Sequence, residues 1–381
     1  MRSGGDTGWL RRTNLVGVVR ELRHLGVAGL SDISSSTGLS RPTVERLVMS
    51  LVKDGWVTET PALADGVGRP GRRFEFRASA ALVVGVDVGA YSIRAAVADL
   101  DGTVVGKAEI QVDPNAGRAV RMEAIRSAMM AALDRAGREP SQIDLVCVGT
   151  PGIVSEGTVR LSTAIPEWTG ADLATEISAW TGCQTIVEND TNLATVAEKW
   201  RGVATEIDDL AFVMAGARTG AGLLSRGVLL KGFHGAAGEI GALELLGWHR
   251  APQHFTSFSH LPAGITRHES AGWVMRAARD GDADAKAAVE SYTKDLAEGI
   301  AAIALLLDPE VVVLGGGASR SADVLIEPLR RHLEPLCIDM PTIMVSSLGD
   351  QAVITGAIRR AIDNIEDRLY DADGLLATGT D

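Results

Sequence analysis

The chain has 381 residues, and its 46 % hydrophobic content with 43 glycines predicts an α/β protein of two or three domains. No apolar run is long enough to span a bilayer and no apolar secretion signal is found, which argues against a membrane protein and predicts a cytoplasmic location. Three separated cysteines in apolar contexts argue against a disulfide framework or a thiolate metal site. They are Cys147, Cys183 and Cys337.

Charge is distributed unevenly along the chain, although the net charge is −12. Residues 1–78 hold 12 Lys and Arg against 8 Asp and Glu, whereas the remaining residues hold 25 against 41. A small basic head on an acidic body is typical of a protein that contacts nucleic-acid phosphates with one end only. We therefore expect residues 1–78 to form a DNA-binding domain.

Three helices followed by a basic hairpin are predicted at the start of the chain. Apolar spacing predicts helices over 15–25, from Ser31 as N-cap to residue 38, and from Ser40 to Gly55. Two alternating segments, 56–59 and 73–76, then read as strands on either side of a stretch rich in Gly, Pro and Arg. This order predicts a winged helix-turn-helix.

The third helix has an outward face that could read DNA. Arg46 is expected to bond a guanine, while Ser40, Arg41 and Thr43 are expected to hold phosphates or contact base edges. Ser40 can also cap the first turn of this helix. The alternative is an amphipathic helix with an ordinary solvated face.

The hairpin adds further basic residues to the head. Arg69-Pro70 in extended form is expected to enter the minor groove, and Arg72 and Arg73 are expected to contact phosphates. The alternative is a flexible basic linker.

The remainder of the chain alternates strands and helices in two similar halves. Strands are predicted near 82–87, 92–99, 145–149, 185–188, 210–214, 311–314 and 343–346, with helices between them. Two α/β lobes with a cleft between them are the expected packing. We assign residues 79–200 to the first lobe, with a helix over 350–368 returning to it, and residues 201–349 to the second. Residues 369–381 are expected to be a disordered tail.

Seven glycine-rich or polar segments follow one another in a characteristic order. They are residues 40–44, 68–70, 84–89, 188–194, 216–222, 235–241 and 313–317. Together they resemble the ROK family of repressors, open reading frames and kinases, over nearly the whole chain. The resemblance implies an actin/hexokinase-like fold for the body.

The resemblance also implies roles for individual residues. Asp190 matches the kinase catalytic base, and Asn189, Asp190 and Glu239 match residues that bond sugar hydroxyls. Trp168 could add a stacking surface to the pocket. The alternative for Asn189 and Asp190 is that they only cap the helix that follows.

The sequence departs from the kinase pattern at several positions. Tyr91 adds bulk in the first phosphate loop, Arg218 stands in the second, and Ala242 replaces a histidine that serves sugar and zinc. Residues 248–254 lack the cysteines of the family's zinc loop. We therefore expect no zinc, no ATP with Mg²⁺, and no other cofactor.

A substitute metal site formed by histidines is the alternative to a metal-free body. Its candidates are His249, His254 and His260. These expectations favour a transcription regulator, a repressor that binds a palindromic operator as a homodimer or homotetramer. A sugar or related metabolite would modulate it. The alternatives are an ATP-dependent hexose kinase with an appended DNA-binding domain, and a DNA-binding protein whose body binds no ligand.

Overall fold

The head of the molecule is a three-helix unit closed by a small antiparallel sheet. The computed structural model describes residues 5–61, 72–216 and 218–370, and these are the residues discussed below. The helices are α1 (Gly5–Leu25), α2 (Leu30–Thr37) and α3 (Arg41–Lys53). Strands β1 (Ala28–Gly29), β3 (Arg73–Phe76) and β2 (Val57–Thr60) form the sheet in that order. The winged helix-turn-helix prediction is confirmed.

The start of α2 differs from the prediction that Ser31 is its N-cap. Gly29 occupies the N-cap position, and its N–H donates to Asp32 Oδ2 at 2.9 Å. The carboxylate of Asp32 therefore satisfies the first free donor, so the helix begins one residue before Ser31. Ser40 does occupy the N-cap of α3, but its hydroxyl lies 2.8 Å from Thr43 Oγ1 and makes no bond to the helix backbone.

The core of the head is continuous with the core of the body. Val18 and Leu22 of α1, with Phe74 and Phe76 of β3, share one apolar cluster with Leu100 in the body. Burying apolar surface across the junction holds the head against the first lobe.

The first lobe is built on a five-stranded sheet in the order β10-β7-β4-β5-β6. Its strands are β4 (Val83–Val88), β5 (Ser92–Ala98), β6 (Val104–Gln111), β7 (Leu145–Thr150) and β10 (Gln184–Asn189). Its helices are α4 (Arg118–Ala136), α5 (Leu173–Thr181) and α6 (Asp190–Arg201), and strands β8 (Ile153–Ser155) and β9 (Thr158–Leu161) form a separate hairpin. Cys147 lies in the buried β7, where burial raises the pKa of its thiol to about 12.

The second lobe repeats this plan with the sheet order β13-β12-β11-β14-β15. Its strands are β11 (Leu210–Met214), β12 (Gly220–Ser225), β13 (Val228–Leu229), β14 (Val311–Gly315) and β15 (Thr342–Val345). Its helices include α7 (Gln253–Thr256), α8 (Arg267–Arg279), α9 (Ala283–Leu307) and α10 (Ala322–Leu333). The two-lobed α/β body is confirmed.

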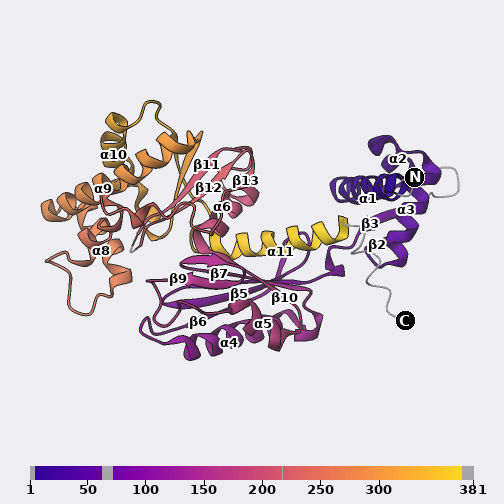
Figure 1. Cartoon of the computed structure of the whole chain (residues 1–381), viewed down its shortest axis with the longest axis horizontal. Coiled ribbons are helices and arrows are strands. Elements are labelled where there is room, and N and C mark those ends of the chain that lie inside the picture. Colours follow the sequence, from indigo (N-terminus) through magenta and orange to yellow (C-terminus); the bar gives the residue numbers. More distant parts are fainter. Residues whose placement is uncertain (1–4, 62–71, 217, 371–381) are drawn as a thin grey trace.

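The final helix, α11 (Ala352–Tyr370), runs across the first lobe toward the head (Figure 1). It packs closely on β4 and α6, because a Cβ added at Gly85 would lie 3.0 Å from the Ile354 carbonyl oxygen and one at Gly356 would lie 1.8 Å from that of Leu193. Only glycine permits backbones to approach this closely. Among the described residues, no helix is both long and apolar enough to cross a membrane.

Candidate functional site

The outward face of α3 presents two arginines to solvent. Val44, Leu47 and Leu51 are buried and fix the orientation of the helix, which leaves Arg41 and Arg46 exposed. Neither arginine makes a hydrogen bond or ion pair within the described part of the chain. Thr43 is half-buried beside them. An exposed, unpaired guanidinium keeps all of its donors for an external acceptor.

The wing arginines are tied into the head. Arg72 donates from Nε and Nη2 to both carboxylate oxygens of Glu59, at 2.7 and 2.6 Å, and this hydrogen bonding lowers the pKa of Glu59. Arg73 donates from Nη2 to the carbonyl oxygen of Val27 at 2.8 Å. Arg72 thereby links the segment before β3 to β2, and Arg73 links β3 to the residue that precedes β1. Arg69 lies outside the described residues.

Asn189 and Asp190 stand at the start of α6, between the lobes. Asn189 accepts from the Asn192 N–H at 3.0 Å as the helix cap, and its amide nitrogen donates to the Gly152 carbonyl oxygen at 3.0 Å. Asn189 is therefore the N-cap of α6, and its contact with a sugar hydroxyl stays a prediction. Asp190 accepts from the N–H of Thr191 at 2.8 Å and from its hydroxyl at 3.2 Å.

A group of carboxylates gathers around Asp190. Burial raises the pKa of Asp190 against the opposing charge of Arg218, and burial followed by the charge of Asp190 raises the pKa of Glu239. Asp87 is buried in β4 and pairs with Arg94 at 3.2 Å, yet burial raises its pKa to about 7. A raised pKa favours the protonated form of a carboxyl group, which can donate to a hydroxyl group as well as accept from it.

The pKa of Asp87 predicts a pH dependence of stability. Its value rises from 3.8 to about 7 on folding, so the folded state binds the proton more tightly and loses stability as pH rises through that window. We expect the free energy of unfolding of the wild type to fall by about 1 kcal/mol more than that of Asp87→Asn between pH 6 and pH 7. Urea unfolding at several pH values measures this. Asp323→Asn is the control, and equal slopes for wild type and Asp87→Asn would contradict the prediction.

The loop after β4, which resembles the first phosphate loop of the kinases, is held by a buried arginine that the sequence analysis did not single out. Arg121 has no exposed surface and donates to the carbonyl oxygens of Gly89 and Ala90, at 2.9 and 3.0 Å. It also donates to those of Asp113 and Pro114, both at 3.2 Å. The loop that would approach a phosphate in a kinase is thereby fastened to α4.

The loop after β11, which resembles the second phosphate loop of the kinases, joins the two lobes. Arg218, which follows β11, donates from Nη2 to the carbonyl oxygen of Ala164 in the first lobe at 3.0 Å. Thr219 donates from its hydroxyl to the carbonyl oxygen of Trp248 at 3.1 Å. Where a phosphate-binding turn would need compact residues, this loop holds an arginine that bridges the lobes.

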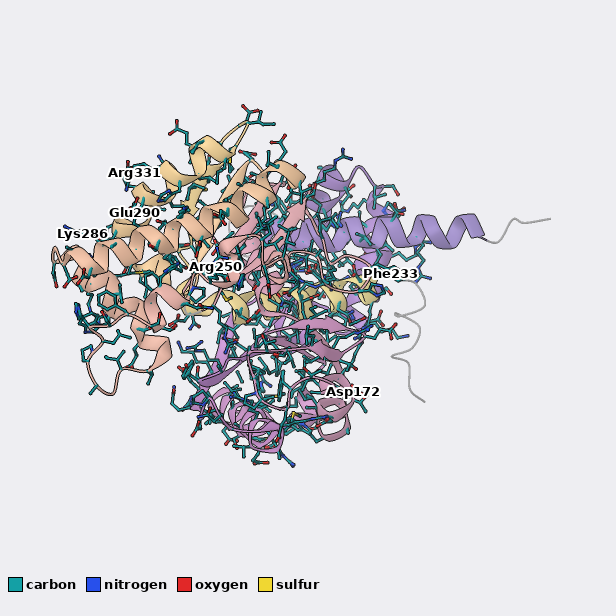
Figure 2. All side chains as sticks on the ribbon, turned by 60° about the vertical axis from the view of Figure 1, so that its left-hand side comes forward. Asp172, Phe233, Arg250, Lys286, Glu290 and Arg331 are labelled. Carbon is teal, nitrogen blue, oxygen red and sulfur yellow. The ribbon has the colours of Figure 1, made fainter. Side chains whose placement is uncertain are left out.

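One predicted ligand residue, Trp168, is placed differently by the structure. Trp168 has no exposed surface and donates from Nε1 to Thr150 Oγ1 at 2.7 Å, so the prediction of a stacking surface is wrong. Phe233 instead is 96 % exposed, in the loop that leads to Glu239 (Figure 2).

The candidate histidines do not assemble into a metal site. His254 Nε2 lies 2.8 Å from Asp295 Oδ2, and His260 Nδ1 lies 3.5 Å from Asp284 Oδ2. Arg250, labelled in Figure 2, also pairs with Asp295 at 3.6 Å. No cluster of three metal-ligating side chains is found in residues 5–61, 72–216 and 218–370.

Two cavities lie away from these carboxylates. One of about 520 Å³ lies between β5, β6 and α11, and one of about 650 Å³ lies between α6, β12, β13 and α11. Neither is lined by Asp190 or Glu239. Asp190 is half-buried and Glu239 is exposed, so solvent reaches this part of the interlobe region.

Comparison with known proteins matches both parts of the chain. A family model described as "ROK family" matches residues 83–252 and 266–363, and one described as "IclR helix-turn-helix domain" matches residues 17–61. A glucokinase from Halalkalibacterium halodurans is 29 % identical over 309 residues, covering 72 % of this chain and 92 % of that protein. A xylose repressor from Caldicellulosiruptor bescii is 23 % identical over 397 residues, covering 95 % of this chain and 98 % of that protein.

A solved structure shares the whole architecture. It is a ROK family transcriptional regulator described as a homolog of the E. coli MLC protein. It has a TM-score of 0.71 at 20 % identity and covers 97 % of this chain and 98 % of that chain. The repressor and this regulator span head and body together, whereas the glucokinase leaves more of the chain unmatched.

Proposed function

Because this chain belongs to the ROK family, we propose that it is a DNA-binding transcription regulator that acts as a repressor. The observation that carries the proposal is the face of α3, where Arg41 and Arg46 are exposed and unpaired within the described residues. A recognition helix inserts its N-terminal residues into the major groove, where Arg46 would bond a guanine. The full-length likeness to a xylose repressor supports this choice.

The operator is proposed to be palindromic and the protein a homodimer or homotetramer. One head reads only a few base pairs, and a two-fold axis through the oligomer repeats the reading on the second half-site. The wing residues Arg72 and Arg73, and Arg69 in the hairpin, would add phosphate and minor-groove contacts.

The effector is proposed to be a sugar or related metabolite held between the lobes. Asp190 and Glu239 offer carboxyl groups for hydroxyl recognition, and Asn189 could add its carbonyl oxygen. The ligand must bind the two forms of the protein with different affinity in order to shift DNA binding. A thermal-shift screen of sugars, sugar phosphates and nucleotides tests the effector, and a body that binds no ligand predicts no shift with any of them.

DNA binding is tested with the full-length chain and genomic duplexes. We expect in vitro selection at about 0.15 M salt to recover a duplex bound about a thousandfold more tightly than random sequence. The region upstream of the protein's own gene is the first candidate. If every duplex binds with the same affinity, the regulator proposal fails.

An ATP-dependent hexose kinase is the second candidate, because Asp190 is retained and a glucokinase is among the relatives. Against it stand the first loop fastened by Arg121 and the arginine in the second loop. A coupled assay for ADP release over a panel of hexoses separates the two. We expect no turnover, and turnover that disappears in Asp190→Ala would establish the kinase.

A further inference from the structure

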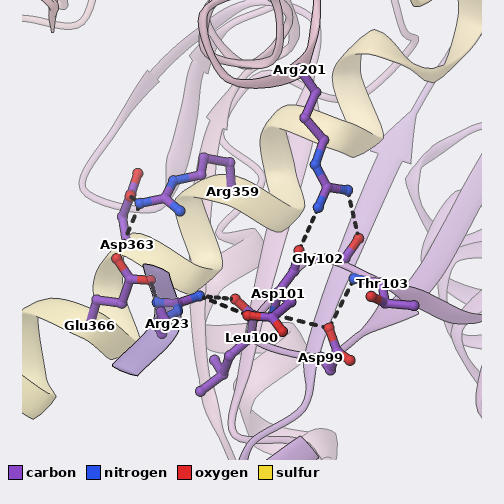
Figure 3. Close-up of polar contacts among 10 residues, drawn as sticks. All are labelled: Arg23, Asp99, Leu100, Asp101, Gly102, Thr103, Arg201, Arg359, Asp363 and Glu366. Atoms are coloured by element: carbon purple, nitrogen blue, oxygen red, sulfur yellow. Dashed lines mark hydrogen bonds and ion pairs between the residues drawn. The ribbon is translucent and has the colours of Figure 1, made fainter. Parts of the chain in front are cut away.

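The turn between β5 and β6, residues 99–103, is a rigid element where three parts of the molecule meet (Figure 3). Asp99 Oδ1 accepts from the N–H groups of Asp101 and Thr103, at 3.0 and 2.9 Å. Gly102 has a φ of +71°, and a Cβ there would lie 2.2 Å from Cη2 of Trp200 on α6. These contacts restrict the turn, and only glycine fits at position 102 beneath that indole.

The end of α6 is fastened to this turn. Arg201 donates from Nη1 to the Gly102 carbonyl oxygen at 2.9 Å and from Nη2 to that of Asp101. Its guanidinium also lies 4.0 Å from the centre of the Trp200 ring, which holds the fork in place. A planar guanidinium that donates to two consecutive carbonyls fixes both direction and distance.

The head is fastened to the opposite side of the same turn. Arg23 of α1 donates to the Leu100 carbonyl oxygen at 2.5 Å, lies 3.3 Å from Asp101 Oδ1, and pairs with Glu366 of α11. Its side chain is only 20 % exposed, and its guanidinium lies 4.9 Å from the Phe76 ring of the wing. These contacts of Arg23, residues 99–103, Arg201 and Glu366 form what we call the head–body joint.

One helix connects the joint to the carboxylates between the lobes. Helix α6 begins at Asp190 and ends at Arg201, a rigid rod about 18 Å long at about 1.5 Å per residue. A cavity of about 650 Å³ lined by Trp200, Arg359 and Asp363 borders its C-terminal half. On its buried face α6 packs closely on α11 at Gly356, so a displacement at Asp190 would carry α6 and α11 together toward the joint.

We propose that Arg201 is a positioning residue for DNA binding, which sets the orientation of the head through the turn at residues 99–103. The proposal rests on the proposed function, in which the head binds an operator and a ligand between the lobes changes that binding. Since Arg201 and Arg23 hold the same turn, a shift of α6 changes the surface on which the head rests. The same coupling runs in reverse, so DNA binding would bias the lobes.

The test uses the full-length chain and a duplex recovered by in vitro selection. We expect Arg201→Ala to weaken binding to that duplex about tenfold. A head that is free to reorient loses more conformational entropy when it binds DNA. Amide hydrogen exchange at residues 99–103 and 14–25 should become faster. Arg201→Lys keeps the charge but loses the planar fork, so it should recover only part of the affinity. The matched control is Arg279→Ala, which removes an exposed arginine paired with Asp323 in the second lobe.

A double variant separates a shared joint from two independent contacts. If Arg23 and Arg201 act through one turn, their effects should not add. The affinity of the double alanine variant for the duplex should then equal that of whichever single variant has the lower affinity. Multiplicative losses, or wild-type affinity in Arg201→Ala, would overturn the proposal. If selection recovers no preferred duplex, the proposed regulator function has failed. The hydrogen-exchange measurement still tests whether Arg201 restrains the head. Unchanged exchange at residues 14–25 in Arg201→Ala would then refute it.

Discussion

Arg46→Ala is expected to weaken binding of the selected duplex by about 1–3 kcal/mol, which is roughly five- to 150-fold, while the body remains folded. The guanidinium of Arg46 is exposed on the N-terminal half of α3 and is not held by a carboxylate in the described residues. A base contact distinguishes sequences, so binding to random duplex should change little. Quantitative binding to the selected duplex, to single-base variants of it and to random duplex measures the loss and locates it.

Two variants make the assignment specific. Lys53 lies at the C-terminal end of α3, and a helix that docks by its N-terminus keeps that end away from the bases. Any loss of affinity in Lys53→Ala should therefore be equal for all duplexes. Arg331→Ala removes an exposed arginine paired with Glu290 on the second lobe and should have no effect (Figure 2). Normal affinity for the selected duplex in Arg46→Ala would refute the assignment of α3 as the recognition helix.

Elements with strong apolar periodicity could be predicted from the sequence because their signal is local. The strand over 210–214 has the bounds of β11, and the stripe from Val44 to Val52 lies on α3. The start of α2 could not be placed correctly, because Asp32 rather than Ser31 supplies the capping oxygen and either residue type suits that role.

The contacts that shape the interlobe region were not predictable from spacing. Arg121 and Arg218 donate to backbone carbonyls 32 and 54 residues away. Every residue has a backbone carbonyl, so residue types do not indicate which one accepts. Trp168 was misplaced for a similar reason, since its burial depends on how residues 150–171 fold back on the sheet. One signal was available: Arg121 stands on the same helical stripe as Ile125 and Met129, where a charged residue calls for an explanation.

Arg121→Met is expected to destabilise the first lobe by about 3 kcal/mol, because the substitution keeps most of the volume and removes all the donors. Two effects oppose each other. Burial lowers the pKa of the Arg121 guanidinium, so removing the charge recovers a desolvation cost. Four carbonyl oxygens lose their donor, and that of Ala90, a buried residue, has little access to water.

The loss of donors should dominate. The carbonyls of Asp113 and Pro114 can bond water instead, whereas those of Gly89 and Ala90 have little access to water and stay without a donor. Each such group costs about 1–3 kcal/mol when left unsatisfied, and the two together are the source of the expected loss. Urea unfolding of the full-length chain measures the difference. The matched control is Arg118→Met on the same helix, whose pair with the half-exposed Glu176 should contribute less than about 1 kcal/mol. If Arg121→Met and Arg118→Met unfold at the same urea concentration, Arg121 does not hold the first loop in place.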